Sequence, residues 1–366
     1  MCASDLGGRR GVPRRVQRSV QRSVQRGLSI VEIMVGVVIS LLVGLAATNS
    51  AVMFSAAQRQ GIGSGGVTVN ATTALAALKN DVTSAGLGFL GDGRLLCQRL
   101  NLSVGAVMMW DGATFSPVRV TREAAADRID VLYGTNVEAG ANVFLQTDSD
   151  GTDAALQSRL PVAAGQAVLL APAAAGDPCV VRSVTATTAA TETDPQRLSF
   201  ANTGAHNAMA FTTTGAYPER SRITLLGDLR WNRYRLDSGN LILERPLEQA
   251  QAVLARNVIA LRSQYGITAA AAGSTTLEDW QNAEGAGFAA LDATTIGRVR
   301  ALRVGIVTRS PQREKPGPSG ECESSLAKPQ LFGVEVEPDV SDWRCYRYRT
   351  GIVVIPLRNL VMGVRS

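Results

Sequence analysis

Hydrophobic and polar residues divide the chain into an apolar amino-terminal segment and a longer remainder in which the two kinds alternate. Between residues 28 and 57 there is one charged residue, Glu32, and no proline. A helix of these 30 residues is about 45 Å long at a rise of about 1.5 Å per residue. That length exceeds the roughly 30 Å hydrocarbon core of a bilayer. The segment is therefore predicted to be a single transmembrane helix.

Glu32 is the exception within this segment. A lone carboxylate in a membrane span costs about 2.5 to 3.5 kcal/mol on insertion scales and needs a partner. One source of a partner for the Glu32 carboxylate is another subunit.

The apolar pattern changes after the span. Four glycines between Gly61 and Gly66 predict a break and a hinge, because glycine is costly within a helix. A second, amphipathic helix is expected from Val67 to Ala85, and Gly86 and Gly88 are expected to end it. Its apolar face is formed by Leu75, Leu78, Val82 and Ala85.

From residue 97 onward, short apolar runs between turn residues predict strands. In the first part these are 106–110, 128–133, 142–146, 166–171, 179–185 and 197–200. Later come a hairpin over 222–244 with its turn at 237–240, and strands at 254–267, 298–310 and 346–360. Alternation places Leu302, Val304 and Ile306 on a buried face and Arg303 and Arg309 on a solvated one, with a bulge before Ala301. The predicted fold is therefore α+β: a long amino-terminal helix followed by an antiparallel, β-rich head.

The basic charge of the chain is concentrated at its amino terminus. Residues 1–27 contain seven arginines and one acidic residue, and the whole chain has a formal charge of +6. The rest, from Leu28, has 30 basic and 30 acidic residues, which argues against a nucleic-acid-binding surface. Arginines before an apolar helix hold the amino terminus in the cytoplasm and send the remainder across the membrane. We thus expect four regions: a leader (1–27), the transmembrane helix (28–59), a hinge and amphipathic helix (60–90), and a head outside the cytoplasm (91–366).

Residues 27 to 32, Gly-Leu-Ser-Ile-Val-Glu, resemble the class III signal of type IV prepilins. The resemblance implies that prepilin peptidase cuts after Gly27 and methylates Leu28, although the family usually has Phe at that position. It also implies that Glu32 neutralises the terminal amine of a neighbouring subunit during assembly. Two alternatives remain: a secretory signal cut near residues 46–51, and a plain signal anchor.

Later segments resemble PilW-like minor pilins. The matching features are Asp81 and Gly86 in the second helix, Gln-Tyr-Gly at 264–266, Arg-Ser at 309–310 and Leu-Arg-Asn at 357–359. The resemblance implies a structural protein that moves from the inner membrane into a type IV pilus, near its tip, and supports pilus assembly, adhesion or motility. The implied partners are prepilin peptidase, major and minor pilins, the inner-membrane assembly platform and a tip adhesin. A type II secretion pseudopilin is the alternative within this class, and a membrane-anchored periplasmic enzyme or ligand-binding protein is the alternative outside it.

The cysteines favour disulfides. The chain has five, and loss of the leader removes Cys2 and leaves four in a compartment that permits disulfides. Three pairings are possible, and Cys97 with Cys179 and Cys322 with Cys345 is preferred. Free buried thiols are the alternative.

Other candidate sites are weak. Asp148, Asp150 and Asp153 alternate before and after a glycine as in calcium loops, but the completing Glu of an EF-hand is missing, so an acidic turn is favoured. His206 is the only histidine and is expected to be a solvated loop residue. We expect no catalytic residues, cofactor or metal.

Overall fold

The computed structural model describes residues 29–91, 94–123, 126–136, 143–174, 176–269, 274, 276–285, 287–317 and 319–362, without the side chains at 52–53, 55–70, 91, 94, 293 and 361–362. The chain divides into two units, residues 1–59 and 60–366. The first contains helix α1 as far as Arg59, and the second contains the end of α1 and all the strands.

Helix α1 (Ile30–Ser84) is one continuous element of 55 residues. The predicted break between Gly61 and Gly66 is therefore wrong, since these residues are helical. A glycine lowers helix stability by about 1 kcal/mol relative to alanine, which is a weak preference. Propagation from the helical segments on both sides outweighs it, because extending a helix is far easier than starting one.

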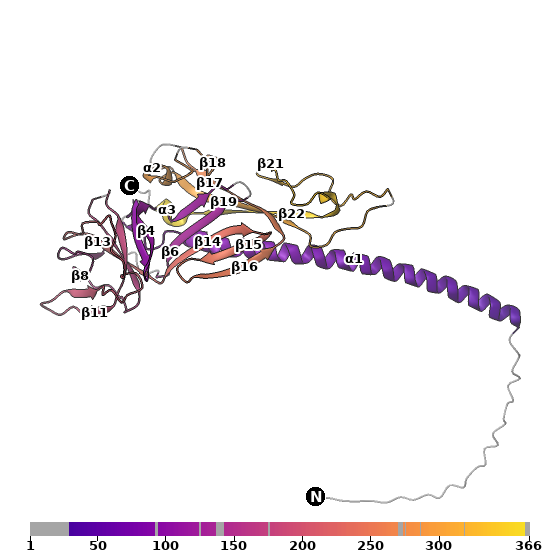
Figure 1. Ribbon diagram of the computed structural model, residues 1–366, viewed down its shortest axis with the longest axis horizontal. Helices are drawn as coiled ribbons and strands as arrows, with labels where there is room; N and C mark the ends of the chain where they lie inside the picture. The colour runs from indigo at the N-terminus through magenta and orange to yellow at the C-terminus, as the bar shows by residue number, and fades with distance from the viewer. Residues whose placement is uncertain are drawn as a thin grey trace, which may run out of the picture. The chain divides into compact units, whose positions relative to one another are not determined.

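Two sheets in the second unit pack against α1 (Figure 1). The five-stranded sheet has the order β16 (Ala250–Arg256), β15 (Asn240–Arg245), β14 (Leu229–Asp237), β6 (Arg128–Gly134) and β5 (Val118–Thr121). The four-stranded sheet has the order β18 (Asp279–Asn282), β17 (Val258–Ile267), β19 (Val299–Arg309) and β22 (Tyr348–Pro356). Both are antiparallel throughout.

A second β region, called the inserted region below, consists mainly of the segment between β6 and β14. The earlier strands β3 and β4 complete it. Its six-stranded sheet has the order β4 (Val107–Thr114), β3 (Arg99–Val104), β10 (Cys179–Ser183), β9 (Ala167–Ala171), β13 (Arg222–Gly227) and β7 (Val143–Phe144). The three-stranded sheet has the order β11 (Ala186–Thr188), β12 (Gln196–Ser199) and β8 (Asp153–Leu156). Among the described strands of these two sheets, β3 and β10 pair in parallel and all other neighbours are antiparallel.

Short elements complete the described chain. These are the strand pairs β1 (Leu90–Gly91) with β2 (Arg94–Leu95) and β20 (Gln330–Leu331) with β21 (Val334–Glu335), and the short helices α2 (Ala293–Ile296), η2 (Trp343–Cys345) and α3 (Arg358–Met362). The predicted fold class is confirmed: a long amino-terminal helix is followed by a mainly antiparallel β-rich unit.

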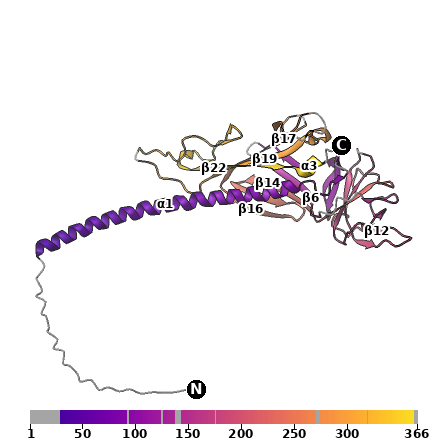
Figure 2. The ribbon, with the colours of Figure 1, turned by 180° about the vertical axis from the view of Figure 1, so that it is seen from behind.

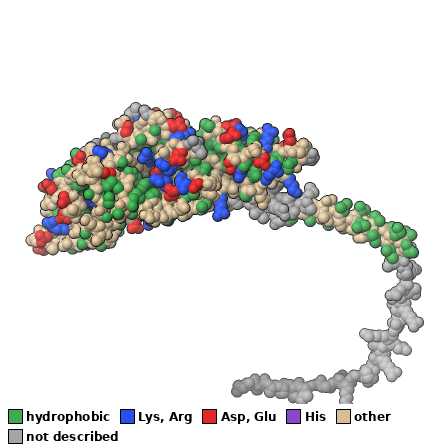
Figure 3. Space-filling model, viewed as in Figure 1, with side chains coloured by type: hydrophobic (Ala, Val, Ile, Leu, Met, Phe, Trp, Pro, Cys, Tyr) green, Lys and Arg blue, Asp and Glu red, His purple; other side chains and the backbone are tan. Residues whose placement is uncertain are grey.

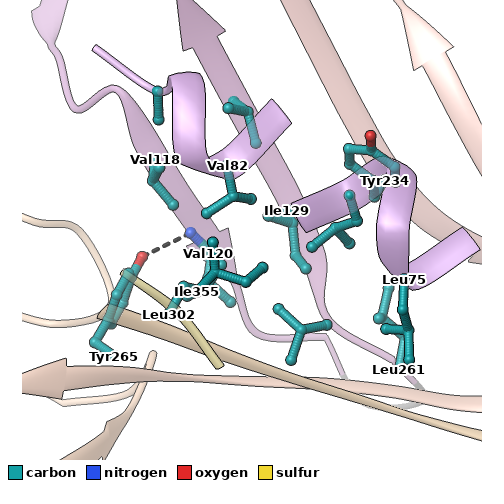
Figure 4. Close-up of a cluster of buried hydrophobic side chains, with 14 of the residues drawn as sticks. Leu75, Val82, Val118, Val120, Ile129, Tyr234, Leu261, Tyr265, Leu302 and Ile355 are labelled. Atoms are coloured by element: carbon teal, nitrogen blue, oxygen red, sulfur yellow. Dashed lines mark hydrogen bonds between the residues drawn. The ribbon is translucent and has the colours of Figure 1, made fainter. Parts of the chain in front are cut away.

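The core of the second unit forms where α1 meets the first two sheets. The helix face predicted from the sequence is buried, with Leu78 and Val82 both 0% exposed. Figure 4 shows labelled side chains from α1, β5, β6, β17, β19 and β22 converging, and the Tyr265 hydroxyl accepting a 2.6 Å hydrogen bond from the Val120 amide. In both ribbon views β14 lies beside the carboxyl-terminal part of α1 (Figures 1 and 2).

The six-stranded sheet is buried on both faces. Along β9, Val168 and Leu170 belong to one apolar cluster, which the three-stranded sheet completes, while Ala167, Leu169 and Ala171 belong to another that includes Trp231 of β14. A continuous apolar run is typical of such a strand. The inserted region is therefore joined to the first sheets through an apolar interface.

Several predicted strands have different limits. The strand expected over 222–237 is divided between two sheets at Gly227, whose φ is +69°. The strand expected over 254–267 is likewise divided at Asn257, with φ of +57°, a conformation that asparagine tolerates better than most residues. The turn at 237–240 is confirmed, with positive φ at Ser238 and Gly239.

The two faces of β19 were predicted in part. Leu302, Val304 and Ile306 are 0% exposed, and the ladder has its bulge before Ala301, as expected. The solvated arginine face is wrong, since the Arg303 guanidinium lies 4.5 Å from the ring centre of Trp280 and 4.4 Å from that of Phe332. The Arg309 side chain is 18% exposed, and its guanidinium lies 4.8 Å from the ring centre of Tyr346. Trp280 of β18 and Phe332, between β20 and β21, cover this face, and strand alternation does not reveal such contacts.

Candidate functional site: the two ends of the long helix

The amino-terminal part of α1 is apolar on all sides. Residues Ile30–Ala51 have a mean hydropathy of 2.6, and none of the window's side chains is buried in the chain. Among the described residues it is the one helix long and apolar enough to cross a membrane, judged by length and composition. The helix is regular from its start, since the Ile33 amide donates to the Ser29 carbonyl at 3.1 Å. The predicted cleavage and methylation positions, Gly27 and Leu28, lie outside the described residues.

The hydroxyl groups of this part of α1 are satisfied within the helix. Ser40 Oγ donates to the Gly36 carbonyl at 2.7 Å, and Thr48 Oγ1 donates to the Gly44 carbonyl at 2.7 Å. Such bonds to the preceding turn let hydroxyl groups lie in an apolar medium. The exposed Glu32 carboxylate, in contrast, has no hydrogen-bond or ion-pair partner among the described residues.

At the other end of α1, Asp81 attaches the helix to the five-stranded sheet. Its carboxylate accepts hydrogen bonds from Tyr133 Oη at 2.9 Å, from Asn232 Nδ2 at 2.5 Å and from Tyr234 Oη. Burial and the neighbouring Asp81 carboxylate raise the pKa of both tyrosines above its ordinary value. This cluster fixes the position of the helix on β6 and β14.

The turn after α1 has the geometry that glycine favours. Gly86 and Gly88 have φ values of +78° and +82°, and the Gly86 amide donates to the Leu132 carbonyl at 3.0 Å. Asn359 Nδ2 donates to the carbonyls of Ser84 at 3.3 Å and Ala85 at 3.0 Å. The Leu-Arg-Asn segment therefore caps the helix, a role that the sequence pattern did not indicate.

A buried carboxylate that we did not predict joins the two helix-backed sheets. Asp127, whose side chain is 0% exposed, forms ion pairs with Arg122 at 3.2 Å and Arg262 at 3.1 Å. It also accepts a 2.6 Å bond from the Ser263 amide. The only sequence signal is an acidic residue just before a strand, which is too common to be informative.

Two disulfides agree with the preferred pairing. Cys97–Cys179 links the segment before β3 to β10, with Cα atoms 5.6 Å apart, and Cys322–Cys345 closes the loop before β22, with Cα atoms 4.9 Å apart. The first connects residues 82 positions apart in sequence, so it ties the inserted region to the segment that follows α1.

The three calcium candidates lie in a turn, but each carboxylate has its own protein partner. Asp148 accepts from the Glu219 amide at 2.7 Å, Asp150 caps the Thr152 amide at 2.8 Å, and Asp153 pairs with Arg197 at 3.7 Å. No group of three or more metal-capable side chains occurs within the described residues. Asp148 and Asp150 lie before β8 and Asp153 is its first residue, and the weak calcium site stays a prediction.

The expectation of a solvated His206 is wrong. The side chain is buried, and Nδ1 lies 2.8 Å from the Ser103 carbonyl. Burial lowers the pKa of the imidazole below its ordinary value. The small residues around it suggested an exposed loop, yet that loop packs against β3.

Comparisons with known proteins add little to these observations. No family model matches the chain, and no curated protein does so either. Among solved structures, a type IV-like pilin from Thermus thermophilus matches with a TM-score of 0.32 and 9% sequence identity, covering 80% of this chain and 96% of that one. Because this TM-score is low, the match supports no statement about the fold, which is defined by the helices and strands of this chain.

Proposed function

We propose that the chain is a pilin, whose apolar helix is stored in a membrane and then packs against the helices of other pilins in a filament. The observation that carries the proposal is Glu32. It is the one charge in an exposed apolar helix whose described hydroxyl groups are satisfied internally. An ionisable residue in a membrane span is usually paired, and on this proposal a positive group of another molecule supplies the partner of Glu32.

The proposed sequence of events follows from this pairing. Prepilin peptidase removes the arginine-rich leader after Gly27 and methylates the new terminus at Leu28. The terminal amine of a neighbouring subunit then pairs with Glu32. In a low-dielectric environment such a pair is strongly favoured over two isolated charges, so it selects the axial register in which subunits enter the filament.

The finer assignment is a PilW-like minor pilin near the tip of a type IV pilus. It would support assembly, adhesion or motility, together with major and minor pilins, the inner-membrane platform and a tip adhesin. Two features agree with it: the acid-bearing end of α1 followed by a glycine turn, and the Leu-Arg-Asn segment that closes that turn. On this proposal the protein acts through assembly and not through catalysis.

The test is incorporation into filaments. Cells producing the wild-type chain or Glu32→Gln are sheared, and the chain is quantified in the pilus and membrane fractions. We expect Glu32→Gln to remain in the membrane, because a neutral amide removes the charge pair. Glu192→Gln, at an exposed loop position, serves as the control and should enter filaments normally. Equal incorporation of all three proteins would contradict the proposal.

A further inference from the structure

A cleft of ≈210 Å³ opens at the junction between the inserted region and the five-stranded sheet. Its walls come from β4, β5, β6 and β14. In the region that these strands occupy in Figure 1, Figure 3 shows hydrophobic side chains beside a group of basic and acidic ones. No role in the proposed assembly of the helix requires this cleft.

One wall of the cleft is aromatic. Trp110 and Trp231 come from two different sheets, and their ring centres lie 4.4 Å apart with an angle of 32° between the planes. Trp231 is nearly buried, whereas Trp110 is partly exposed. The Arg233 guanidinium lies 4.9 Å from the centre of the Trp231 ring. The aromatic surface is thus held in place from behind, and Trp110 forms its accessible part.

The other walls contain hydrogen-bonding groups with a fixed arrangement. Asp130 is the centre of this arrangement: it accepts from Trp231 Nε1 at 2.9 Å and from Arg233 Nε at 2.7 Å, and pairs with Arg128 Nε at 3.4 Å. Arg119 also lines the cleft, is exposed, and has no hydrogen-bond or ion-pair partner among the described residues. One guanidinium therefore remains available beside a preorganised aromatic and polar surface.

We propose that this cleft binds an acidic saccharide, namely a hexuronate unit of a polysaccharide. The guanidinium of Arg119 pairs with the sugar carboxylate, since guanidinium groups match carboxylates in geometry and charge. The indole of Trp110 receives the apolar C–H face of the ring. The Thr114 hydroxyl exchanges hydrogen bonds with the sugar hydroxyls, and Ser116 Oγ, which donates to the Val118 carbonyl at 2.6 Å, accepts one from them. The volume suits about one sugar ring, so neighbouring units extend beyond the cleft.

A nucleic-acid strand fits the surroundings less well, although its bases stack on aromatic rings and its phosphates bind arginines. Acidic residues flank the cleft: Glu123 pairs with Arg128 at 3.1 Å and Glu244 lies 3.7 Å from Arg233 Nη1. These carboxylates repel the charges of either polymer, but they accept hydrogen bonds from sugar hydroxyls, of which a uronate ring offers several and a nucleotide within a strand at most one. A strand-binding groove requires a continuous positive surface, and this one is interrupted.

The test is calorimetric titration of the full-length chain in non-ionic detergent micelles with trigalacturonate, its neutral counterpart galactotriose, and a short single-stranded oligothymidylate. We expect trigalacturonate to bind and galactotriose to bind about tenfold more weakly or worse, because a hydrogen bond to a charged group is lost. Arg119→Ala should weaken trigalacturonate binding to a similar extent. Arg349→Ala, which removes another exposed arginine on the edge strand β22, should leave it unchanged.

The aromatic wall is tested separately. Trp110→Leu should weaken binding, and Trp110→Phe should restore most of it, while circular dichroism verifies that both variants are folded. The proposal is overturned if trigalacturonate gives no heat at about 10 mM, if it binds no better than galactotriose, or if Arg119→Ala and Arg349→Ala behave alike. Tighter binding of oligothymidylate would assign the cleft to a nucleic acid instead.

Discussion

The two halves of α1 are made of the same secondary structure but meet different surroundings. In Ile30–Ala51 apolar residues occur all round the helix, and none of the window's side chains is buried in the chain. In the last turns Leu75, Leu78 and Val82 form one face that is buried against two sheets, and the polar residues Lys79 and Asn80 lie on the exposed side. The backbone hydrogen bonds of a helix are satisfied in either setting. The distribution of side chains therefore determines whether a helix packs on its own sheet or on a lipid or another molecule.

Two acidic residues, one in each half of α1, differ in the same way. Asp81 accepts hydrogen bonds from three side chains of its own chain, whereas Glu32 has no partner among the described residues. A carboxylate that finds donors within the chain stabilises the fold. Glu32 differs from other exposed acids, such as Glu192, in lying within an apolar helix, and this setting is the reason for the proposal that another molecule supplies its partner.

The largest expected effect is the loss of packing in the buried half. Leu78→Ala removes a side chain that is 0% exposed and should lower the free energy of unfolding by about 2 to 5 kcal/mol. Leu42→Ala removes the same atoms at a position that is 62% exposed and should change it by less than about 0.5 kcal/mol. Guanidinium denaturation of the micelle-bound chain, followed by tryptophan fluorescence, measures both. Similar losses of unfolding free energy in the two variants would contradict the difference between the two halves of α1.

The next effect concerns the Asp81 cluster. Asp81→Asn replaces an acceptor of three hydrogen bonds by an amide with fewer lone pairs, and should cost about 1 to 3 kcal/mol of unfolding free energy. Asp228→Asn is the control: that side chain is 68% exposed and lies 3.5 Å from Arg230, an exposed pair of low value. The same denaturation experiment compares them. If the control is as destabilising as Asp81→Asn, the helix is not held by this cluster.

The cluster also predicts a dependence on alkaline pH. Tyr133 and Tyr234 have pKa values above the ordinary 10.0 in the folded chain, so the folded state binds more protons than the unfolded state above pH 10. Their contribution to stability is complete below pH 10 and is lost progressively as the pH rises from there through the raised pKa values of the folded state. Tyr234→Phe should make the loss less steep. Part of the pH dependence of stability should remain in this variant, because the pKa values of Tyr217 and Tyr265 are also raised. An unchanged slope in the variant would contradict this account.

The smallest effect is expected where the halves of the helix join. Gly63→Ala should raise stability by up to about 1 kcal/mol and increase the helical signal at 222 nm, because residue 63 is helical. Gly86→Ala should have the opposite sign, since Gly86 has a φ of +78° and an added Cβ would lie 3.2 Å from Pro117 Cγ. A loss of stability in Gly63→Ala would restore the hinge predicted from the sequence.

Local patterns were sufficient for part of the fold and the site. The apolar span, the buried face around Leu78 and the turn at residues 237–240 follow from spacing and residue type, and the preferred disulfide pairing was one of three that four cysteines allow. Each depends on interactions close in sequence or, for the disulfides, on a small number of possible pairings. Glu32 was recognisable for a similar reason, because a charge within an apolar run is conspicuous.

The rest depends on contacts between distant segments. The division of the strand at Gly227 and the burial of His206 depend on which sheet each segment joins, and no local pattern specifies that. Arg303 was expected to be solvated because β19 alternates regularly, but Trp280 of β18 and Phe332, between β20 and β21, cover it. The glycines from Gly61 to Gly66 were misleading because helix propensity is a weak preference that flanking helix overrides.

The most direct test of the central claim is the mass of the amino-terminal peptide of the membrane-extracted chain, with and without prepilin peptidase. The account predicts that the peptide begins at N-methylated Leu28 when the peptidase is present and retains the leader when it is absent. A leader that remains intact in both cases, or a cut near Ala47, would contradict the assignment of this helix to a pilin.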